Sequence, residues 1–127
     1  MAQANKKLHE LTIREAGELL KDGDLSPVEL TQACFNRIDQ TEDRLHSFIT
    51  LLQDRAMGEA RKSEAEIRSG NYKGPMHGIP IVLKDLYDTA GIRTTSGSQV
   101  DFDRVPTTDS TATSRLADAG AVLLGKV

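Results

Sequence analysis

A lysine directly after a short apolar run is the residue of this chain best placed for acid–base chemistry. Residues 79–83 are Ile-Pro-Ile-Val-Leu, Lys84 follows them, and a polar, glycine-containing segment occupies 91–98. Ligands of open α/β sheets gather outside the carboxyl ends of the strands, where Lys84 is expected to lie. A lysine that acts as a base must be neutral part of the time near pH 7, so its pKa must lie well below the ordinary value of about 10.4. Desolvation at the end of a covered strand, or a nearby cation, produces such a change.

Asp85 decides whether Lys84 is available as a base. A carboxylate close to the ammonium would keep it protonated, but successive side chains of a strand point to opposite faces, so we expect Asp85 to turn away from Lys84. Taken alone, Lys84 is more simply a strand-end lysine in a salt bridge, because strongly perturbed lysines are exceptions.

Other side chains with reactive groups favour structural roles. Ser96 and Ser98 flank a glycine, as turn residues do, and we reject them as catalytic serines. His77 lies in a proline- and glycine-rich turn without a visible partner, which favours a loop-shaping role. Cys34 lacks the cationic or helix-start setting of a nucleophile. Arg93 is either a contact for a substrate carboxylate or, more simply, an exposed loop arginine.

The last residues partly match a phosphate-binding P-loop. Residues 120–126 are Gly-Ala-Val-Leu-Leu-Gly-Lys, but Val127 stands where the magnesium-binding Ser or Thr belongs. The four middle residues are strand formers, whereas a P-loop needs a turn whose N–H groups face a phosphate. We therefore interpret Lys126 as an ordinary strand-end lysine and reject nucleotide binding.

Composition argues against several classes of protein. The chain has 127 residues, 38% of them apolar and 28% charged, as in a soluble globular domain. Its 16 Lys and Arg against 19 Asp and Glu give a net charge of −3, and the basic residues are scattered, so direct nucleic-acid binding is not expected. His9, His46 and His77 lie far apart without cysteine or carboxylate at ligand spacing, so no metal is expected. No cofactor is predicted.

The sequence also predicts a cytoplasmic location. Residues 1–7 contain no apolar run that would serve as a signal peptide, and no segment reaches transmembrane length, so no membrane association is expected. Cys34 is the only cysteine, which excludes an internal disulfide and fits a reducing compartment.

The first half of the chain predicts helices. Thr12 and Glu15 form a capping-box pattern before a short amphipathic helix with Ile13, Ala16 and Leu20 on one face. Ser26 and Glu29 form a second one, with a proline at the first helical position. A charged helix is predicted over 54–69, ahead of a glycine stop, and residues 47–51 are a short strand candidate.

The second half predicts the beginning of a parallel sheet. The apolar runs 79–83 and 121–124 are typical of strands covered on both faces, and a helix from Asp109 or Ser110 to Ala119 separates them. The order strand, helix, strand is a βαβ unit. The fold class is therefore α/β: N-terminal helices over 1–70, then the first strands and helix of a mixed, mostly parallel sheet over 71–127. We interpret the 127 residues as a single incomplete domain: either the opening portion of a larger α/β protein or a chain whose missing strands come from another chain. We expect its open strand edges to make it aggregation-prone.

The pattern from residue 74 to 126 resembles the first part of the amidase signature family. The matching features are a glycine-rich approach to a strand that ends in Lys-Asp, a polar Thr-Thr-Ser-Gly-Ser segment, and a terminal Ala-Gly-Ala-Val-Leu-Leu-Gly-Lys. The helical segment 11–69 resembles the family more loosely. A pattern spread over some fifty positions is more specific than any short motif.

The resemblance implies an amide hydrolase with a Ser–cis-Ser–Lys triad. A lysine at the position of Lys84 takes a proton from a bridging serine in a cis peptide, and that serine activates a nucleophilic serine. Backbone N–H groups near the serines would hold the developing oxyanion. Both serines lie beyond Val127 in family members, so we expect these 127 residues alone to be inactive.

The resemblance leaves the substrate and the partners open. We favour a general amidase acting on a small-molecule amide, because Leu86 and Tyr87 replace the Asn-Ile-like pair usual in the corresponding subunits of glutamine-dependent tRNA amidotransferases. Such an amidotransferase component, which works with companion proteins, is the first alternative. A non-catalytic truncated or partner-binding product is the second. A homodimer of the full-length protein is a further possibility.

Overall fold

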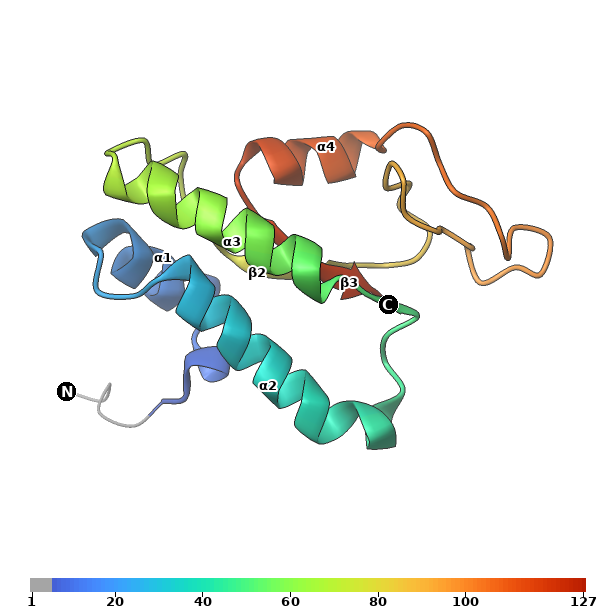
Figure 1. Cartoon of the computed structure of the whole chain (residues 1–127), viewed down its shortest axis with the longest axis horizontal. Helices are drawn as coiled ribbons and strands as arrows, with labels where there is room; N and C mark the ends of the chain where they lie inside the picture. Colours follow the sequence, from blue (N-terminus) through green and yellow to red (C-terminus); the bar gives the residue numbers. More distant parts are fainter. Residues whose placement is uncertain (1–5) are drawn as a thin grey trace.

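The computed structural model describes residues 6–127, and four α-helices and three strands make up its regular structure (Figure 1). The expectation that no signal peptide is present falls largely on residues outside this range. In chain order the elements are a 3-10 turn over Leu8–Glu10, α1 over Ile13–Asp22, α2 over Pro27–Leu45, β1 over Thr50–Leu51, α3 over Gln53–Arg68, β2 over Pro80–Leu83, α4 over Thr111–Asp118 and β3 over Val122–Lys126.

The two predicted helix starts are confirmed. The hydroxyl of Thr12 accepts a hydrogen bond from the N–H of Glu15, whose carboxylate accepts one from the N–H of Thr12, so both halves of the capping box are present. Ser26 and Glu29 make the same exchange at the start of α2. The face predicted for α1 is confirmed for Ala16 and Leu20, which are buried. It is wrong for Ile13, which is 51% exposed because the buried face of this helix is centred further along the chain.

The sheet is mixed, with the strand order β1-β3-β2. β2 and β3 are parallel neighbours joined through α4, which confirms the predicted βαβ unit, and β1 pairs antiparallel with the other edge of β3. The strand expected over 47–51 is only two residues long, Thr50–Leu51. The predicted α/β class with N-terminal helices is therefore correct.

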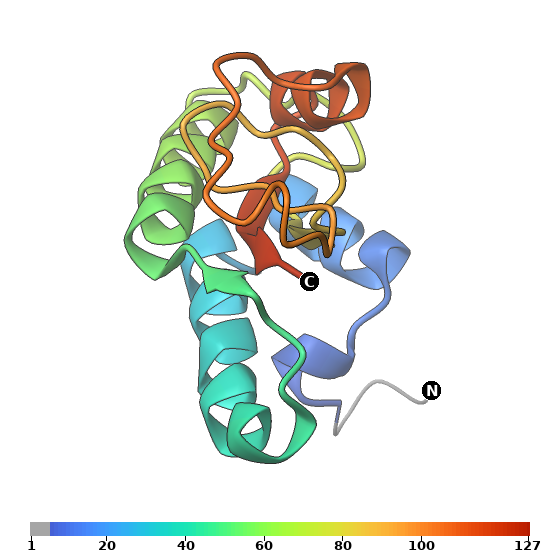
Figure 2. The same cartoon turned by 90° about the vertical axis from the view of Figure 1, so that its right-hand side faces the viewer.

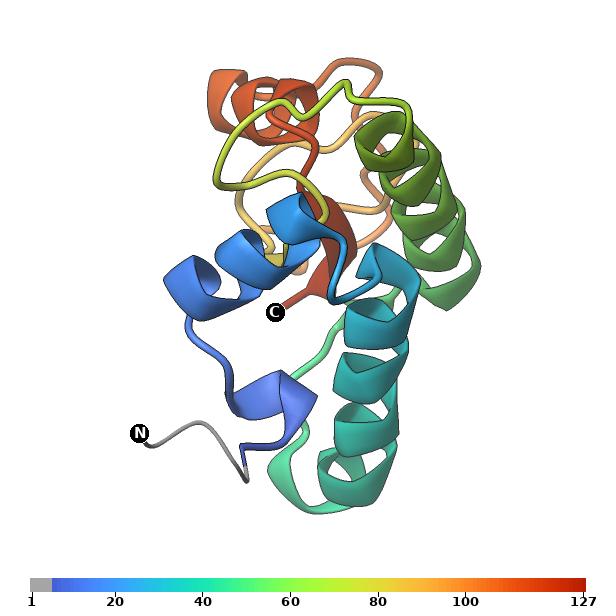
Figure 3. The ribbon, with the colours of Figure 1, turned by 90° about the vertical axis from the view of Figure 1, so that its left-hand side faces the viewer.

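Side chains of β3 alternate between two apolar clusters. Val122 and Leu124 point toward α2 and α3, where they pack with Phe35, Ala56 and Ala60. On the other face Leu123 packs with Leu83 and Ile92. Figures 2 and 3 show β3 in the middle of the molecule, with α3 on one side of it. The expectation that β3 is covered by other residues on both of its faces is therefore confirmed.

β2 is covered less completely than its apolar sequence suggests. Leu83 is buried, but Val82 is 44% exposed, and β2 pairs with β3 along one edge only within residues 6–127. The expectation that run 79–83 is covered on both faces is therefore wrong for Val82 in this chain. None of the helices in the described part of the chain is long and apolar enough to cross a membrane.

Candidate functional site

Lys84 lies where the sequence predicts, at the carboxyl end of a parallel strand. β2 ends at Leu83, whose register partner in β3 is Lys126, and Lys84 is the next residue. The side chain of Lys84 is exposed, and its ammonium makes no hydrogen bond or ion pair with any residue of 6–127. The alternative interpretation, in which Lys84 forms a salt bridge at the end of the strand, is therefore not found among the described residues.

Asp85 turns away from Lys84, as strand alternation predicts. Its carboxylate is 3% exposed, and Oδ2 accepts hydrogen bonds from the N–H of Thr95 at 3.0 Å and from the hydroxyl of Thr95 at 2.5 Å. The backbone carbonyl of Asp85 accepts a further bond from the N–H of Ser96 at 2.8 Å. The residue after Lys84 thus ties the polar segment 91–98 to the end of β2.

Lys126 is fully buried and is not the ordinary strand-end lysine that the sequence suggested. Its ammonium donates hydrogen bonds to the carbonyl of Tyr87 at 2.8 Å, to the hydroxyl of Thr89 at 3.1 Å and to the hydroxyl of Thr94 at 2.9 Å. Asp85 Oδ1 lies 3.7 Å from the same nitrogen. Burial lowers the pKa of Lys126 from its ordinary value, and the nearby Asp85 carboxylate opposes that change.

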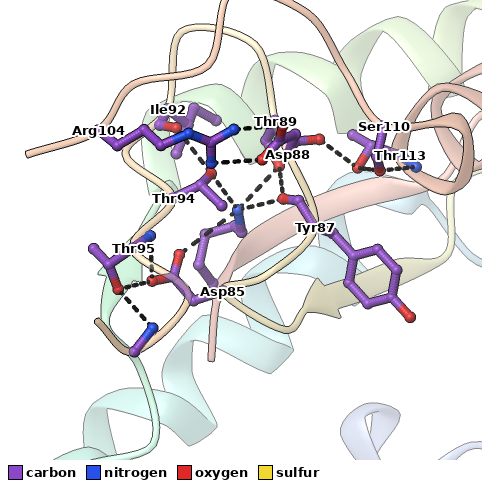
Figure 4. A network of polar contacts seen from close by, with 12 residues as sticks. Asp85, Tyr87, Asp88, Thr89, Ile92, Thr94, Thr95, Arg104, Ser110 and Thr113 are labelled. Atoms are coloured by element: carbon purple, nitrogen blue, oxygen red, sulfur yellow. Dashed lines mark hydrogen bonds and ion pairs between the residues drawn. The ribbon is translucent and has the colours of Figure 1, made fainter. Parts of the chain in front are cut away.

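The outer part of this network reaches α4 (Figure 4). Arg104 makes a two-pronged ion pair with Asp88, with nitrogen–oxygen distances of 2.8 and 2.7 Å. The hydrogen bonds from Arg104 hold the pKa of the Asp88 carboxyl below its usual range. The backbone carbonyl of Asp88 accepts hydrogen bonds from the N–H of Ser110 and the hydroxyl of Thr113, at the start of α4. The long connection from β2 to α4 is therefore an ordered polar structure.

The serines near Lys84 support the turn interpretation. Ser96 has a positive φ of 53°, Gly97 has one of 65°, and the hydroxyl of Ser98 accepts a bond from the N–H of Val100. Neither serine hydroxyl contacts Lys84 within the described residues. The segment 120–126 that matches part of a P-loop is mostly strand β3, so it presents no phosphate-binding turn.

His77 is buried and has partners that the sequence did not reveal. Its Nδ1 accepts a hydrogen bond from the N–H of Lys73 at 3.0 Å, so the proton sits on Nε2, which lies 3.0 Å from a carboxylate oxygen of Glu66. A Cβ at Gly120 would overlap the imidazole ring. The prediction of a structural role stands, but the expectation that His77 has no partner is wrong.

The other candidates occupy ordinary positions. Cys34 is half-buried beside Phe35 and Ala56, and burial raises the pKa of its thiol. The guanidinium carbon of Arg93 lies 4.9 Å from the ring centre of Phe102, a cation–π contact. Among residues 6–127 no group of three His, Cys, Asp or Glu side chains gathers at a metal-binding distance.

Sequence reasoning missed Lys126 and its threonine partners. The available signal was a pair of opposite charges, Asp85 and Lys126, each at the end of a predicted strand of one βαβ unit. Parallel pairing brings strand ends to the same edge of a sheet, which predicts that the two side chains meet.

Comparisons with known proteins all identify one family. The sequence profile described as Amidase matches residues 29–127. The chain is 39% identical over 120 residues to the A subunit of the glutamyl-tRNA(Gln) amidotransferase of Syntrophus aciditrophicus, a match that covers 94% of this chain and 24% of that protein. It is 40% identical over 122 residues to an amidase of Pseudomonas putida, a match that covers 94% of this chain and 25% of that protein.

Solved structures give the same result. The fold matches native peptide amidase from Stenotrophomonas maltophilia with a TM-score of 0.82 and 38% identity, over 92% of this chain and 24% of that one. The chain thus spans about a quarter of the length of the relatives that it matches.

Proposed function

Because this chain belongs to the amidase signature family, we propose that it supplies the base-bearing portion of an amide hydrolase, with Lys84 as the general base. The observation that carries the proposal is the position of Lys84. It follows the carboxyl end of β2 with an exposed side chain, while the neighbouring Asp85 is buried on the other side and faces Lys126.

The proposed chemistry is acyl transfer to a serine. Neutral Lys84 accepts a proton from a bridging serine, which takes one from the nucleophilic serine as that oxygen attacks the amide carbonyl. Collapse of the tetrahedral intermediate breaks the C–N bond, and the amine leaves with a proton returned along the same relay. Water then hydrolyses the acyl-serine. In this proposal both serines come from outside these 127 residues, and the chain supplies the lysine of the three side chains.

The exposure of Lys84 fits a mechanism in which this chain supplies the lysine and another part of the enzyme supplies the serines. A lysine base needs a dry environment to lower its pKa, whereas the Lys84 residue is exposed in the part of the chain that the structure describes. The half-exposed Val82 and the unpaired edge of β2 lie beside it. We propose that the serine-bearing part of the enzyme covers this surface and desolvates Lys84.

A chimera tests whether the chain provides a working portion of a hydrolase. In it, the matched residues of this chain replace the corresponding quarter of the Pseudomonas putida amidase, and release of ammonia from small aliphatic and aryl amides is measured. We expect the chimera to hydrolyse an amide that the parent amidase accepts, and the 127-residue chain alone to release none. A folded chimera without hydrolysis would contradict the proposal, as would turnover by the chain alone.

The second candidate is a component of a tRNA amidotransferase, favoured by the 39% identity to the Syntrophus aciditrophicus protein. The pair Leu86 and Tyr87 argues against it, since the resemblance implies an Asn-Ile-like pair there. In that case ammonia would come from glutamine, and only with companion subunits present. Ammonia release from glutamine that depends on added subunits would support this candidate, whereas hydrolysis of simple amides without them supports the general amidase.

A further inference from the structure

The polar network behind Lys84 centres on a lysine to which the proposed reaction assigns no role. Lys126 is the register partner of Leu83 in the parallel pair β2–β3, so its backbone lies one residue from Lys84 across the sheet. The N–H of Asp85 bonds to the carbonyl of Val127 at 2.8 Å, which continues the pairing one step past Lys84. The two lysines therefore occupy adjoining positions at the same end of the sheet.

All three donors of the Lys126 ammonium are used within one loop. A lysine has three N–H donors, and here they bond to the Tyr87 carbonyl and to the hydroxyls of Thr89 and Thr94. Tyr87 and Thr89 belong to the part of the loop that leaves β2, and Thr94 to the part that returns. The ammonium thus joins the two arms of the loop through these three bonds. Figure 4 labels its partners Tyr87, Thr89 and Thr94.

Asp85 closes the network on the side of Lys84. Its Oδ2 holds Thr95, while Oδ1 is buried without a hydrogen bond and lies 3.7 Å from Lys126. The ion pair with Lys126 is therefore the interaction in the described chain that balances the charge of this carboxylate. Because Asp85 directly follows Lys84 in the chain, its placement determines where the backbone of Lys84 leaves β2.

We propose that Lys126 is a positioning residue for Lys84. Its hydrogen bonds hold the loop 85–95 in place and so set the direction of Lys84, and its ion pair with Asp85 neutralises the carboxylate next to Lys84. This inference rests on the proposed function of Lys84. The charged groups that act on the Lys126 ammonium are Asp85, Asp88 and Arg104. A methionine of similar length would fill the same space but would leave Asp85 buried without a counter-charge.

Two variants and one control test the clamp in the 127-residue chain itself. Lys126→Met removes the donors, and Asp85→Asn/Lys126→Met removes both buried charges so that folding does not depend on an unpaired carboxylate. Lys62→Met replaces an exposed lysine of α3 and is the control. We expect amide hydrogen exchange at Thr95 and Ser96 to rise about tenfold or more in both test variants, while exchange in α2 of the double variant changes little. Exchange at these two amides equal to that of the control would overturn the proposal.

The same variants in the chimera with the Pseudomonas putida amidase test the link to Lys84. Mispositioning a base slows the chemical step rather than substrate binding, so Lys126→Met should lower kcat about tenfold to a hundredfold and leave KM within about threefold. The double variant should recover part of the lost kcat. Equal losses in kcat for the single and double variants, or a change confined to KM, would contradict the positioning role.

The two measurements separate failure of this inference from failure of the proposed function. An unmodified chimera that folds but hydrolyses no amide would remove the proposed function, while hydrogen exchange would still decide whether Lys126 clamps the loop. An active chimera whose kcat is indifferent to Lys126→Met would leave the hydrolase proposal standing and remove the positioning role.

Discussion

Two lysines end neighbouring strands of one parallel pair, and their surroundings are opposite. Lys84 follows β2, is exposed and touches no other charged group of the described chain. Lys126 closes β3, is completely buried, and makes three hydrogen bonds and an ion pair. Both residues are lysines and both lie at the carboxyl ends of their strands, so neither the residue type nor the end of the sheet explains the difference.

The difference comes from the side of the sheet that each lysine faces. Alternation along β2 turns Asp85 to the same side as Leu83, toward the loop, and turns Lys84 to the opposite side, where its side chain is exposed. In β3, a register shift at Leu124 interrupts the alternation and brings Lys126, the partner of Leu83, to the loop side as well. A charge on the covered side must be paired to be tolerated, whereas a charge on the open side stays available. Of the two, therefore, the buried lysine has the structural role and the exposed one is the candidate base.

The largest expected effect is on stability, and it belongs to Lys126. Removing one partner of a buried ion pair leaves an uncompensated charge, so Lys126→Met should lower the free energy of unfolding by about 3–5 kcal/mol. Lys84→Met is the matched variant on the open side, and it should change that free energy by no more than about 0.5 kcal/mol. Urea unfolding of both proteins, followed by circular dichroism, measures the contrast. Similar losses for both would remove the distinction between the two lysines.

A smaller effect is expected one residue earlier in β3. A Cβ at Gly125 would overlap the Thr50 carbonyl oxygen and would approach the Phe48 ring to 2.9 Å, so Gly125→Ala should cost about 1–3 kcal/mol through overpacking. Gly58, in the exposed middle of α3, has no atom within 4 Å of such a Cβ. Gly58→Ala should therefore raise the free energy of unfolding by about 0.5–1 kcal/mol, because alanine has a higher helix propensity than glycine. The same unfolding experiment measures both, and a Gly125→Ala variant as stable as the unmodified chain would mean that β1 does not pack on β3 as described.

The smallest effect concerns the helical half, whose charged groups are mostly exposed. Hydrogen bonds from Lys6 and from the backbone of Thr12 lower the pKa of Glu15 to about 2. The unfolded value is near 4.3. A carboxyl whose pKa is lower in the folded state stabilises the fold above its unfolded pKa, and that contribution disappears as the pH falls from about 4.3 toward 2.

Glu15→Gln should therefore make the free energy of unfolding less dependent on pH between about 4.5 and 2. It should leave the pH dependence above this range unchanged. Denaturation curves measured at several pH values for both proteins test this. An identical slope in the two proteins would show that Glu15 has an ordinary pKa.

The helical half could be predicted from the sequence because its signals are local. A capping box spans four residues, so Thr12 with Glu15 and Ser26 with Glu29 mark their helices without knowledge of the rest of the chain. The order of strand, helix and strand likewise predicted the parallel pair. The same local reasoning placed Lys84 at the end of β2 and turned Asp85 away from it.

What the sequence did not reveal depends on contacts between distant residues. Thr89 and Thr94 are more than thirty positions from Lys126, and only the folded loop brings them to its ammonium. The partners of His77 arise in the same way, since Glu66 reaches it from α3. The exposure of Val82 could not be predicted either, because an apolar run alone does not say which of its faces the rest of the chain covers.

The most direct test of the central claim is the hydrolytic rate of the chimera with Lys84 replaced. Loss of a general base costs roughly 10²- to 10⁴-fold in rate, so Lys84→Ala should lower kcat/KM for amide hydrolysis by that amount, while Lys62→Ala leaves it unchanged. Circular dichroism should show both variants folded. Retention of full activity by folded Lys84→Ala would contradict the assignment of Lys84 as the base.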